Sequence, residues 1–277
     1  MNRNLRSLFI GALIVALSFS AAGCANTINK LKARDALNKG VNLYKNAQFD
    51  DAIEKFKEAK QLDPALLNAR LYLAAAYTGQ YIPGAPSEEN IRRGESAVEE
   101  YKEILRMDPN NLAAIDGVGS ILFFMAAQPY DPKKFDESRS FHLKHIEIKP
   151  DDPEPYYSVG VINWTLAYRA NREMRIEYNK TARKRLNDDQ PFTGKLRDDF
   201  MANYGPMIDQ GIDELKKAIQ LRPDYDDAMA YLNLLYRQKA DIADTDAERQ
   251  QLLQDADALV DRVKEIKQKK MEAPPKS

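Results

Sequence analysis

The chain has 277 residues, of which 44% are hydrophobic and 30% are charged, with 41 basic residues against 42 acidic ones. This composition is typical of a globular, charge-rich protein. A formal net charge of −1 gives no strong field that would attract nucleic acid, so we expect no nucleic-acid partner.

The first 23 residues have the pattern of a secretory signal. Arg3 and Arg6 precede a continuous apolar run over 8–17, and small residues follow as far as Gly23. A membrane-spanning helix needs roughly 20 apolar residues, and this run is too short. We therefore expect residues 1–23 to act as a signal peptide.

Cys24 is the only cysteine, so it cannot form a disulfide within the chain. Residues 21–24, Ala-Ala-Gly-Cys, resemble the lipobox of bacterial lipoproteins, with Ala21 where that family usually has Leu. The resemblance implies cleavage before Cys24 and lipid attachment to its sulfur. Cleavage after Ala22 with simple export, or an uncleaved chain, are the alternatives.

The same resemblance predicts where the protein lies. Ala25 occupies the position at which the family's inner-membrane retention signal has Asp. We therefore expect an outer-membrane lipid anchor that faces the periplasm, with residues 24–34 as a lipidated linker. The membrane is then contacted through the anchor.

A repeated pattern follows the linker. Four segments align without gaps, each with a small residue, a bulky residue four positions later and a final proline: 49–64, 94–109, 135–150 and 208–223. The pattern resembles the tetratricopeptide repeat. The resemblance implies an all-α fold, an α-solenoid of helical hairpins over 35–243.

Small residues in this pattern occur where two helices cross closely, and the proline ends the second helix because it has no amide hydrogen. Ala52 and Gly119 are therefore predicted at close helix crossings. The other matching positions include Gly40, Phe56, Ala97, Tyr101, Ser138, Gly160, Gly211 and Ala218, with Pro64, Pro109, Pro150 and Pro223 at the ends.

The array departs from its family in length. The intervals between the prolines are 45, 41 and 73 residues, against the family period of about 34. Two predicted loops explain why the first two intervals are longer than the period. They lie at 81–90, where Ser87 is the expected N-cap of the next helix, and at 127–134. We interpret the third, an insertion at about 168–205, as an overlong helix that projects from the stack. A diverged extra repeat is the alternative.

A final helix is predicted at 244–270. Thr245 and Glu248 have the spacing of a capping box, and apolar residues then recur at helical intervals. Such a helix would cap the array, and the tail 271–277 is expected to be disordered.

No enzymatic constellation is present in the sequence, and we predict no catalytic, cofactor or metal site. His142 and His145 are three residues apart and could both face a metal, but their repeat positions are explained by packing. The basic run 169–185 is interpreted as a solvated face, with lipid head groups or an acidic partner as the alternative.

The tetratricopeptide resemblance implies that the first helices of successive hairpins line a groove for a partner's peptide segment. An apolar and aromatic lining of this kind favours interaction. The predicted partner-binding residues are Tyr44, Leu71, Phe123, Phe124, Tyr157, Val161, Trp164 and Arg237. The alternative is that the terminal helix or the insertion fills the groove.

These features together predict an envelope-anchored scaffold that binds other envelope proteins or their segments. The alternative is an envelope protein whose groove holds an apolar ligand or a lipid.

Overall fold

The computed structural model describes residues 26–272, and every regular element in that range is a helix. The all-α class is therefore confirmed. The chain forms two compact units, Met1–Ile121 and Leu122–Ser277. The signal-like segment, Cys24 and residues 273–277 lie outside the described range.

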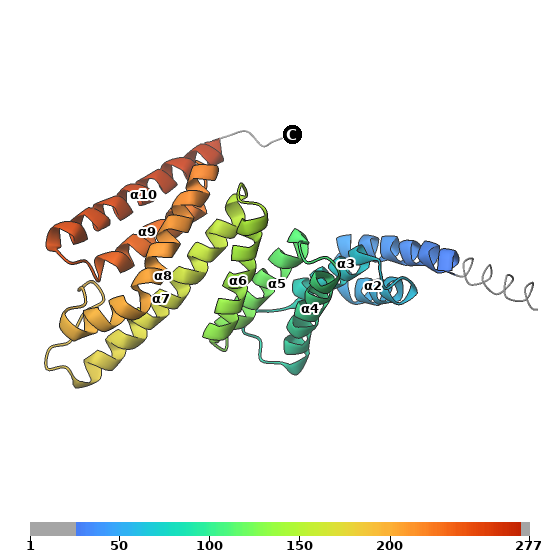
Figure 1. The fold of residues 1–277 in the computed structure, drawn as a ribbon, viewed down its shortest axis with the longest axis horizontal. Helices are drawn as coiled ribbons and strands as arrows, with labels where there is room; N and C mark the ends of the chain where they lie inside the picture. The colour runs from blue at the N-terminus through green and yellow to red at the C-terminus, as the bar shows by residue number, and fades with distance from the viewer. Residues whose placement is uncertain (1–25, 273–277) are drawn as a thin grey trace, which may run out of the picture. The chain divides into compact units, whose positions relative to one another are not determined.

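The helices follow one another along the chain, most of them with short connections (Figure 1). Residues 26–34, predicted as a linker, are helical and continue to residue 45, with Ala33 buried. The first unit continues with α2 (Phe49–Leu62), α3 (Leu67–Gln80), α4 (Glu88–Met107) and the start of α5 (Leu112–Ala127). The second contains α6 (Pro132–Ile148), α7 (Pro153–Thr181), α8 (Gly194–Leu221), α9 (Asp226–Ala240) and α10 (Asp246–Glu272).

Four helices end in the same way, two residues before a proline. A proline forces the residue before it out of the helical region and into extended geometry. The C-cap residues accordingly have φ of −139°, −138°, −138° and −133° and ψ of 80° to 93°. The backbone N–H of each still donates to the carbonyl four residues earlier. These residues are Asp63, Asp108, Lys149 and Arg222.

The connections are of two kinds. Each proline-containing joint has the same length, as residues 63–66, 108–111, 149–152 and 222–225 show. The turns that alternate with these joints vary in length, from the short turn 46–48 to the long loop 182–193. The departures from the repeat period thus lie in the alternate turns and in the helices beside them.

Short polar side chains cap some of the helix starts. The Ser87 hydroxyl accepts from the N–H of Asn90 at 3.2 Å, so its prediction as the N-cap of α4 is confirmed. The Thr245 hydroxyl accepts from the N–H of Glu248 at 3.1 Å. The Glu248 carboxylate, however, accepts from the N–H of Asp244, one residue before the position that a capping box would use.

Small residues allow close packing in the first unit. A Cβ added at Gly40 would lie 2.5 Å from Cε1 of Phe56, and one at Gly117 would lie 2.3 Å from Cζ of Tyr101. Ala52 is fully buried in the same core as Phe56. Aromatic rings thus occupy the space that the missing side chains leave.

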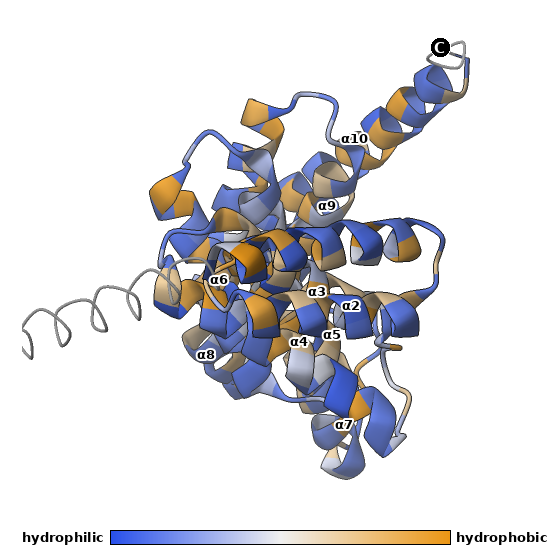
Figure 2. Ribbon diagram, turned by 90° about the vertical axis from the view of Figure 1, so that its right-hand side faces the viewer, coloured by the Kyte–Doolittle hydropathy of each residue, from blue (hydrophilic) through white to orange (hydrophobic). Residues whose placement is uncertain are grey.

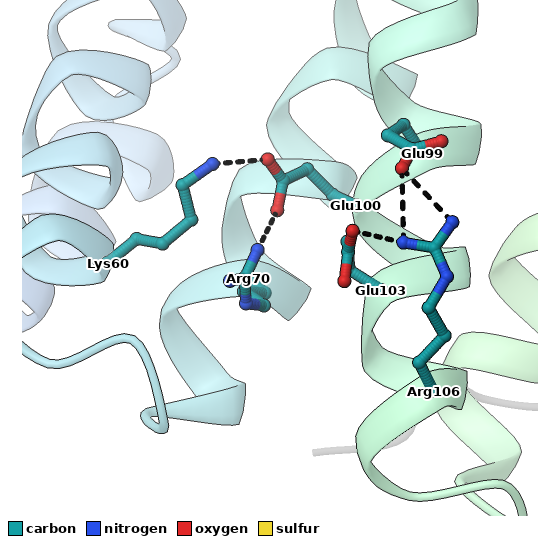
Figure 3. Close-up of polar contacts among 6 residues, drawn as sticks. All are labelled: Lys60, Arg70, Glu99, Glu100, Glu103 and Arg106. Carbon is teal, nitrogen blue, oxygen red and sulfur yellow. Dashed lines mark hydrogen bonds and ion pairs between the residues drawn. The ribbon is translucent and has the colours of Figure 1, made fainter.

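A partly buried carboxylate joins three helices of this unit (Figure 3). Glu100 of α4 accepts from Lys60 of α2 and, at 2.9 Å, from Arg70 of α3. The Glu100 side chain is only 12% exposed, so these pairs are screened less than surface pairs. Arg106, by contrast, pairs with Glu99 and Glu103 on the exposed side of its own helix.

The second unit is built on α7 and α8, which lie side by side in Figure 1 and are joined by the loop 182–193. Two long continuous helices account for the long interval between prolines, so the alternative of an extra repeat is wrong. The hairpin does not stand free. The N–H of Phe192 donates to the carbonyl of Asp241, and Arg197 donates to the carbonyl of Ile242.

The last helix, α10, packs against α9. Its hydrophilic and hydrophobic residues are interleaved along its length in Figure 2. Ala256 is its only buried residue within the described range. None of the helices described between residues 26 and 272 is long and apolar enough to span a bilayer.

Candidate functional site

The predicted binding residues of the first unit are half-buried. The ring of Tyr44 packs edge-on against Phe49, with the ring centroids 5.4 Å apart. Leu71 of α3 is also half-buried. Both side chains have surface that a partner could contact, and Tyr44 also packs against the core of this unit.

Phe123 and Phe124 differ in their surroundings. Phe123 packs edge-on against Phe135 at 5.4 Å between centroids, beside a small core cluster. Phe124 is 42% exposed and contacts Phe123. Phe124 is thus the more exposed of the two and the one that a partner could contact more readily.

Tyr157 and Val161 lie deeper than the groove prediction implied. Tyr157 packs against the rings of Tyr225 and Tyr231, at 5.1 and 5.8 Å between centroids. Burial raises the pKa of Tyr157 to about 12. Val161 is only 8% exposed. Tyr157 therefore packs α7 against Tyr225 and α9, and Val161 has little surface to contact a partner.

Trp164 and Arg237 line a common cleft of about 420 Å³, which we call the α9 cleft. Trp164 lies on α7 and Arg237 on α9, and Leu253 of α10 lines the cleft with them. Arg237 pairs with Asp257 of α10, but both side chains are largely exposed, so this pair adds little stability.

A buried polar network lies beside the α9 cleft. The Arg175 guanidinium and the Asn171 amide donate to the Asp241 carboxylate, at 3.3 and 3.1 Å. Burial raises the pKa of Asp241 to about 6, and the charge of Arg175 acts in the opposite direction. Because Asn171 and Arg175 belong to α7 and Asp241 follows α9, the network fixes these segments around the cleft.

A second cleft, which we call the α6 cleft, has a volume of about 450 Å³. Tyr130, Phe135 and Ile176 line it, and most of its lining side chains are apolar or aromatic. The Arg169 guanidinium lies 4.0 Å from the Tyr130 ring centroid, in the geometry of a cation–π contact.

Three residues of α7 line both clefts, and we call them the ridge: Trp164, Tyr168 and Arg172. The Trp164 and Tyr168 rings stack at 5.2 Å between centroids, and Tyr231 supports Trp164 edge-on at 5.2 Å. Tyr168 is 43% exposed. The ridge is therefore a supported aromatic surface that is open to solvent.

The terminal helix fills the groove only in part. α10 packs on α9 and contributes Leu253 and Arg249 to the α9 cleft. The cleft nevertheless keeps its volume, and Trp164 remains partly exposed. The terminal helix therefore forms one wall of the cleft but does not fill it.

Tyr168, Arg172 and the contribution of α10 to the α9 cleft were not predicted from the sequence. Tyr168 lies four residues after Trp164, one helical turn away, and this spacing could have placed it on the same face. The α9 cleft brings α7 and α10 together from distant parts of the sequence, and local spacing contains no signal for this arrangement.

The two histidines lie in the core, as their repeat positions predicted. His142 and His145 are 5% and 3% exposed. Burial lowers the pKa of His142 to about 4, and the neighbouring His145 adds to this effect. Over residues 26–272, no group of three or more His, Cys, Asp or Glu side chains has the arrangement of a metal site.

Comparison with known proteins identifies the fold. No protein-family model matches the chain, and no curated protein is similar to it in sequence. A crystal structure of MamA is 16% identical, with a TM-score of 0.55, over 92% of this chain and 98% of that one. MamA from Desulfovibrio magneticus RS-1 is 15% identical over 86% and 96% of the two chains, with a TM-score of 0.57.

A third solved structure is YrrB, described as a TPR protein with an unusual peptide-binding site. It is 14% identical over 89% of this chain and 97% of its own, with a TM-score of 0.52. At such identities the similarity concerns the fold alone. The chain therefore has the all-α, solenoid-type fold of tetratricopeptide helical hairpins that its repeat pattern predicted.

Proposed function

We propose that this protein is a scaffold that binds a segment of a partner protein across the ridge. The observation that carries the proposal is the stacked pair of Trp164 and Tyr168 between two open clefts. Aromatic and arginine side chains are the residues that most often anchor protein interfaces. The ridge presents two aromatic rings and Arg172 together.

The chemistry of the clefts supports a peptide over an apolar ligand. The α9 cleft combines the apolar Leu234 and Leu253 with the charged Arg237 and Asp241. A lipid chain would enclose these charged groups in an apolar environment, whereas a peptide has polar groups beside its side chains. The structural similarity to YrrB, with its described peptide-binding site, favours the same kind of ligand.

Replacing Trp164 with alanine tests this proposal. We expect capture of a partner, first identified by crosslinking in intact cells, to weaken about thirtyfold, since truncating a central aromatic anchor often costs about 2 kcal/mol or more. Capture is measured in detergent extract, and the melting temperature and helix content are measured on the same variant.

Tyr178→Ala is the matched control, because Tyr178 is an α7 aromatic that is 42% exposed and is absent from the linings of both clefts. It should capture the partner as the native chain does. A Trp164→Ala variant with a lower melting temperature and undiminished capture by the folded fraction would remove Trp164 from the binding site.

We further propose that Cys24 attaches the scaffold to the envelope, in the outer membrane and facing the periplasm. The support is the signal-like pattern of residues 1–23 and the small residues before Cys24. The partners would then be other envelope proteins.

Cys24→Ser should move the protein from the membrane fraction to the soluble fraction after a high-salt wash, because acyl chains resist salt whereas electrostatic contacts do not. Membrane partition that the substitution leaves unchanged after this wash would contradict lipid anchoring.

A further inference from the structure

The loop between α7 and α8 holds three consecutive cations, Arg183, Lys184 and Arg185. All three side chains are exposed. Within residues 26–272, none of them forms a hydrogen bond or an ion pair. We call these three residues the basic tip.

The loop does not need these cations for its own conformation. The Asn179 side chain accepts from the N–H of Leu186 at 2.8 Å and donates to its carbonyl at 3.0 Å. Arg175 donates to the carbonyls of Asn187 and Gln190, at 2.6 and 2.9 Å. These bonds fix the backbone on the α8 side of the basic tip.

Most of the other cations in this region have structural partners. Arg169 pairs with Glu173 at 2.8 Å, and Lys180 pairs with Glu177 at 2.6 Å. Arg175 pairs with Asp241 at 3.3 Å. The unpaired positive charge is therefore concentrated in the basic tip, with Arg172 of the ridge further back along α7.

The nearby carboxylates do not neutralise the basic tip. Asp188 and Asp189 follow it in the loop, but both line the α9 cleft. None of the three tip residues lines either cleft. The basic tip is thus a surface separate from the proposed partner site.

Apolar side chains are exposed beside the basic tip. Ile176 is 54% exposed and Tyr178 is 42% exposed, and both belong to the last two turns of α7. Cations together with an aliphatic and an aromatic side chain suit the boundary between lipid head groups and acyl chains. Ile176 also lines the α6 cleft, whereas Tyr178 lines neither cleft, and an acidic protein would satisfy the cations but gives no reason for exposed Tyr178.

We propose that the basic tip docks on a bilayer surface that contains anionic phospholipid. Each cation near such a surface strengthens binding severalfold, and the effect falls off within a Debye length. The contact is reversible and salt-sensitive. It would hold the α7–α8 hairpin at the membrane while the ridge remains available to a partner.

A fluorophore at the end of α7 tests the proposal. In the full chain carrying Cys24→Ser, Thr181→Cys provides a unique site for an environment-sensitive NBD label. Vesicles of phosphatidylcholine with about one-third phosphatidylglycerol should shift its emission to the blue and raise its intensity. The same label at Gln220→Cys, near the opposite end of α8, is the control and should not respond.

The triple variant Arg183→Gln, Lys184→Gln, Arg185→Gln should raise the lipid concentration for half-maximal response by roughly a hundredfold. The matched control is Lys264→Gln, Lys267→Gln, Lys269→Gln on α10, which removes the same charge and should have little effect. A Thr181 label that ignores anionic vesicles, or responds equally to pure phosphatidylcholine, would overturn the proposal. So would equal responses from the two triple variants.

Discussion

Replacing Gly160 with leucine should lower the free energy of unfolding by about 1–3 kcal/mol, the usual cost of overpacking a core. A Cβ at Gly160 would lie 2.4 Å from Cγ of Leu215 and 2.7 Å from its Cδ2. Leu215 is fully buried, so its branched side chain has no open space into which it can move. The better helix propensity of leucine offsets at most about 1 kcal/mol of this cost.

Gly79→Leu is the matched control, because the nearest atoms to a Cβ at Gly79 are at 3.8 and 4.0 Å. Both variants are compared with the native chain by urea unfolding. Leu215→Ala introduced into the Gly160→Leu variant should recover part of the lost stability, because it removes the clash. Equal stabilities for the two glycine variants would show that α7 and α8 do not cross closely at Gly160.

Acid should destabilise the protein through His142, by roughly 3 kcal/mol between pH 6.5 and pH 4. Burial lowers the pKa of His142 from 6.5 to about 4 in the folded chain. Its Nδ1 has no hydrogen-bond partner among the described residues, so nothing there compensates a buried positive charge. In the unfolded chain the imidazole has its ordinary pKa and binds a proton first.

Because the unfolded chain binds this proton at a higher pH than the folded chain, acid favours unfolding. The contribution of His142 to stability is fully present above about pH 6.5, falls as the pH decreases, and is lost near pH 4. The variant His142→Gln keeps a polar side chain that does not titrate. Its stability should therefore change less between about pH 7 and about pH 4.5 than that of the native chain, as measured by urea unfolding. Parallel pH profiles would mean that the pKa of His142 is the same in the folded and unfolded chains.

The parts of the fold that depend on local chemistry were predictable from the sequence. The four prolines predicted the helix ends because proline constrains the residue before it. Ser87 predicted a helix start because its hydroxyl reaches the N–H of Asn90 three residues later. The buried positions of His142 and Gly160 followed from the repeat spacing. Each of these inferences needs only a few neighbouring residues.

The clefts were not predictable in the same way. Trp164 and Arg237 were predicted as binding residues, but their shared cleft depends on α10, whose position is set by packing on α9. Arg175 belongs to a run that was interpreted as a solvated face, yet it is 4% exposed. Its partner Asp241 is distant in the sequence, so the spacing of neighbouring residues could not predict that contact.

The equal length of the proline-containing joints limits how such a chain can change during evolution. An α-helix turns by about 100° per residue, so one residue gained or lost in a joint such as 149–152 would present a different face of the next helix to the hairpin before it. A turn inside a hairpin has no such effect if both helices lengthen together, as α7 and α8 do.

Insertions are therefore tolerated in the turns inside the hairpins but not in the proline-containing joints between them. The basic tip belongs to the longest of the tolerated turns, 182–193. New binding surfaces can be acquired there by lengthening a turn while the packing between hairpins is inherited unchanged.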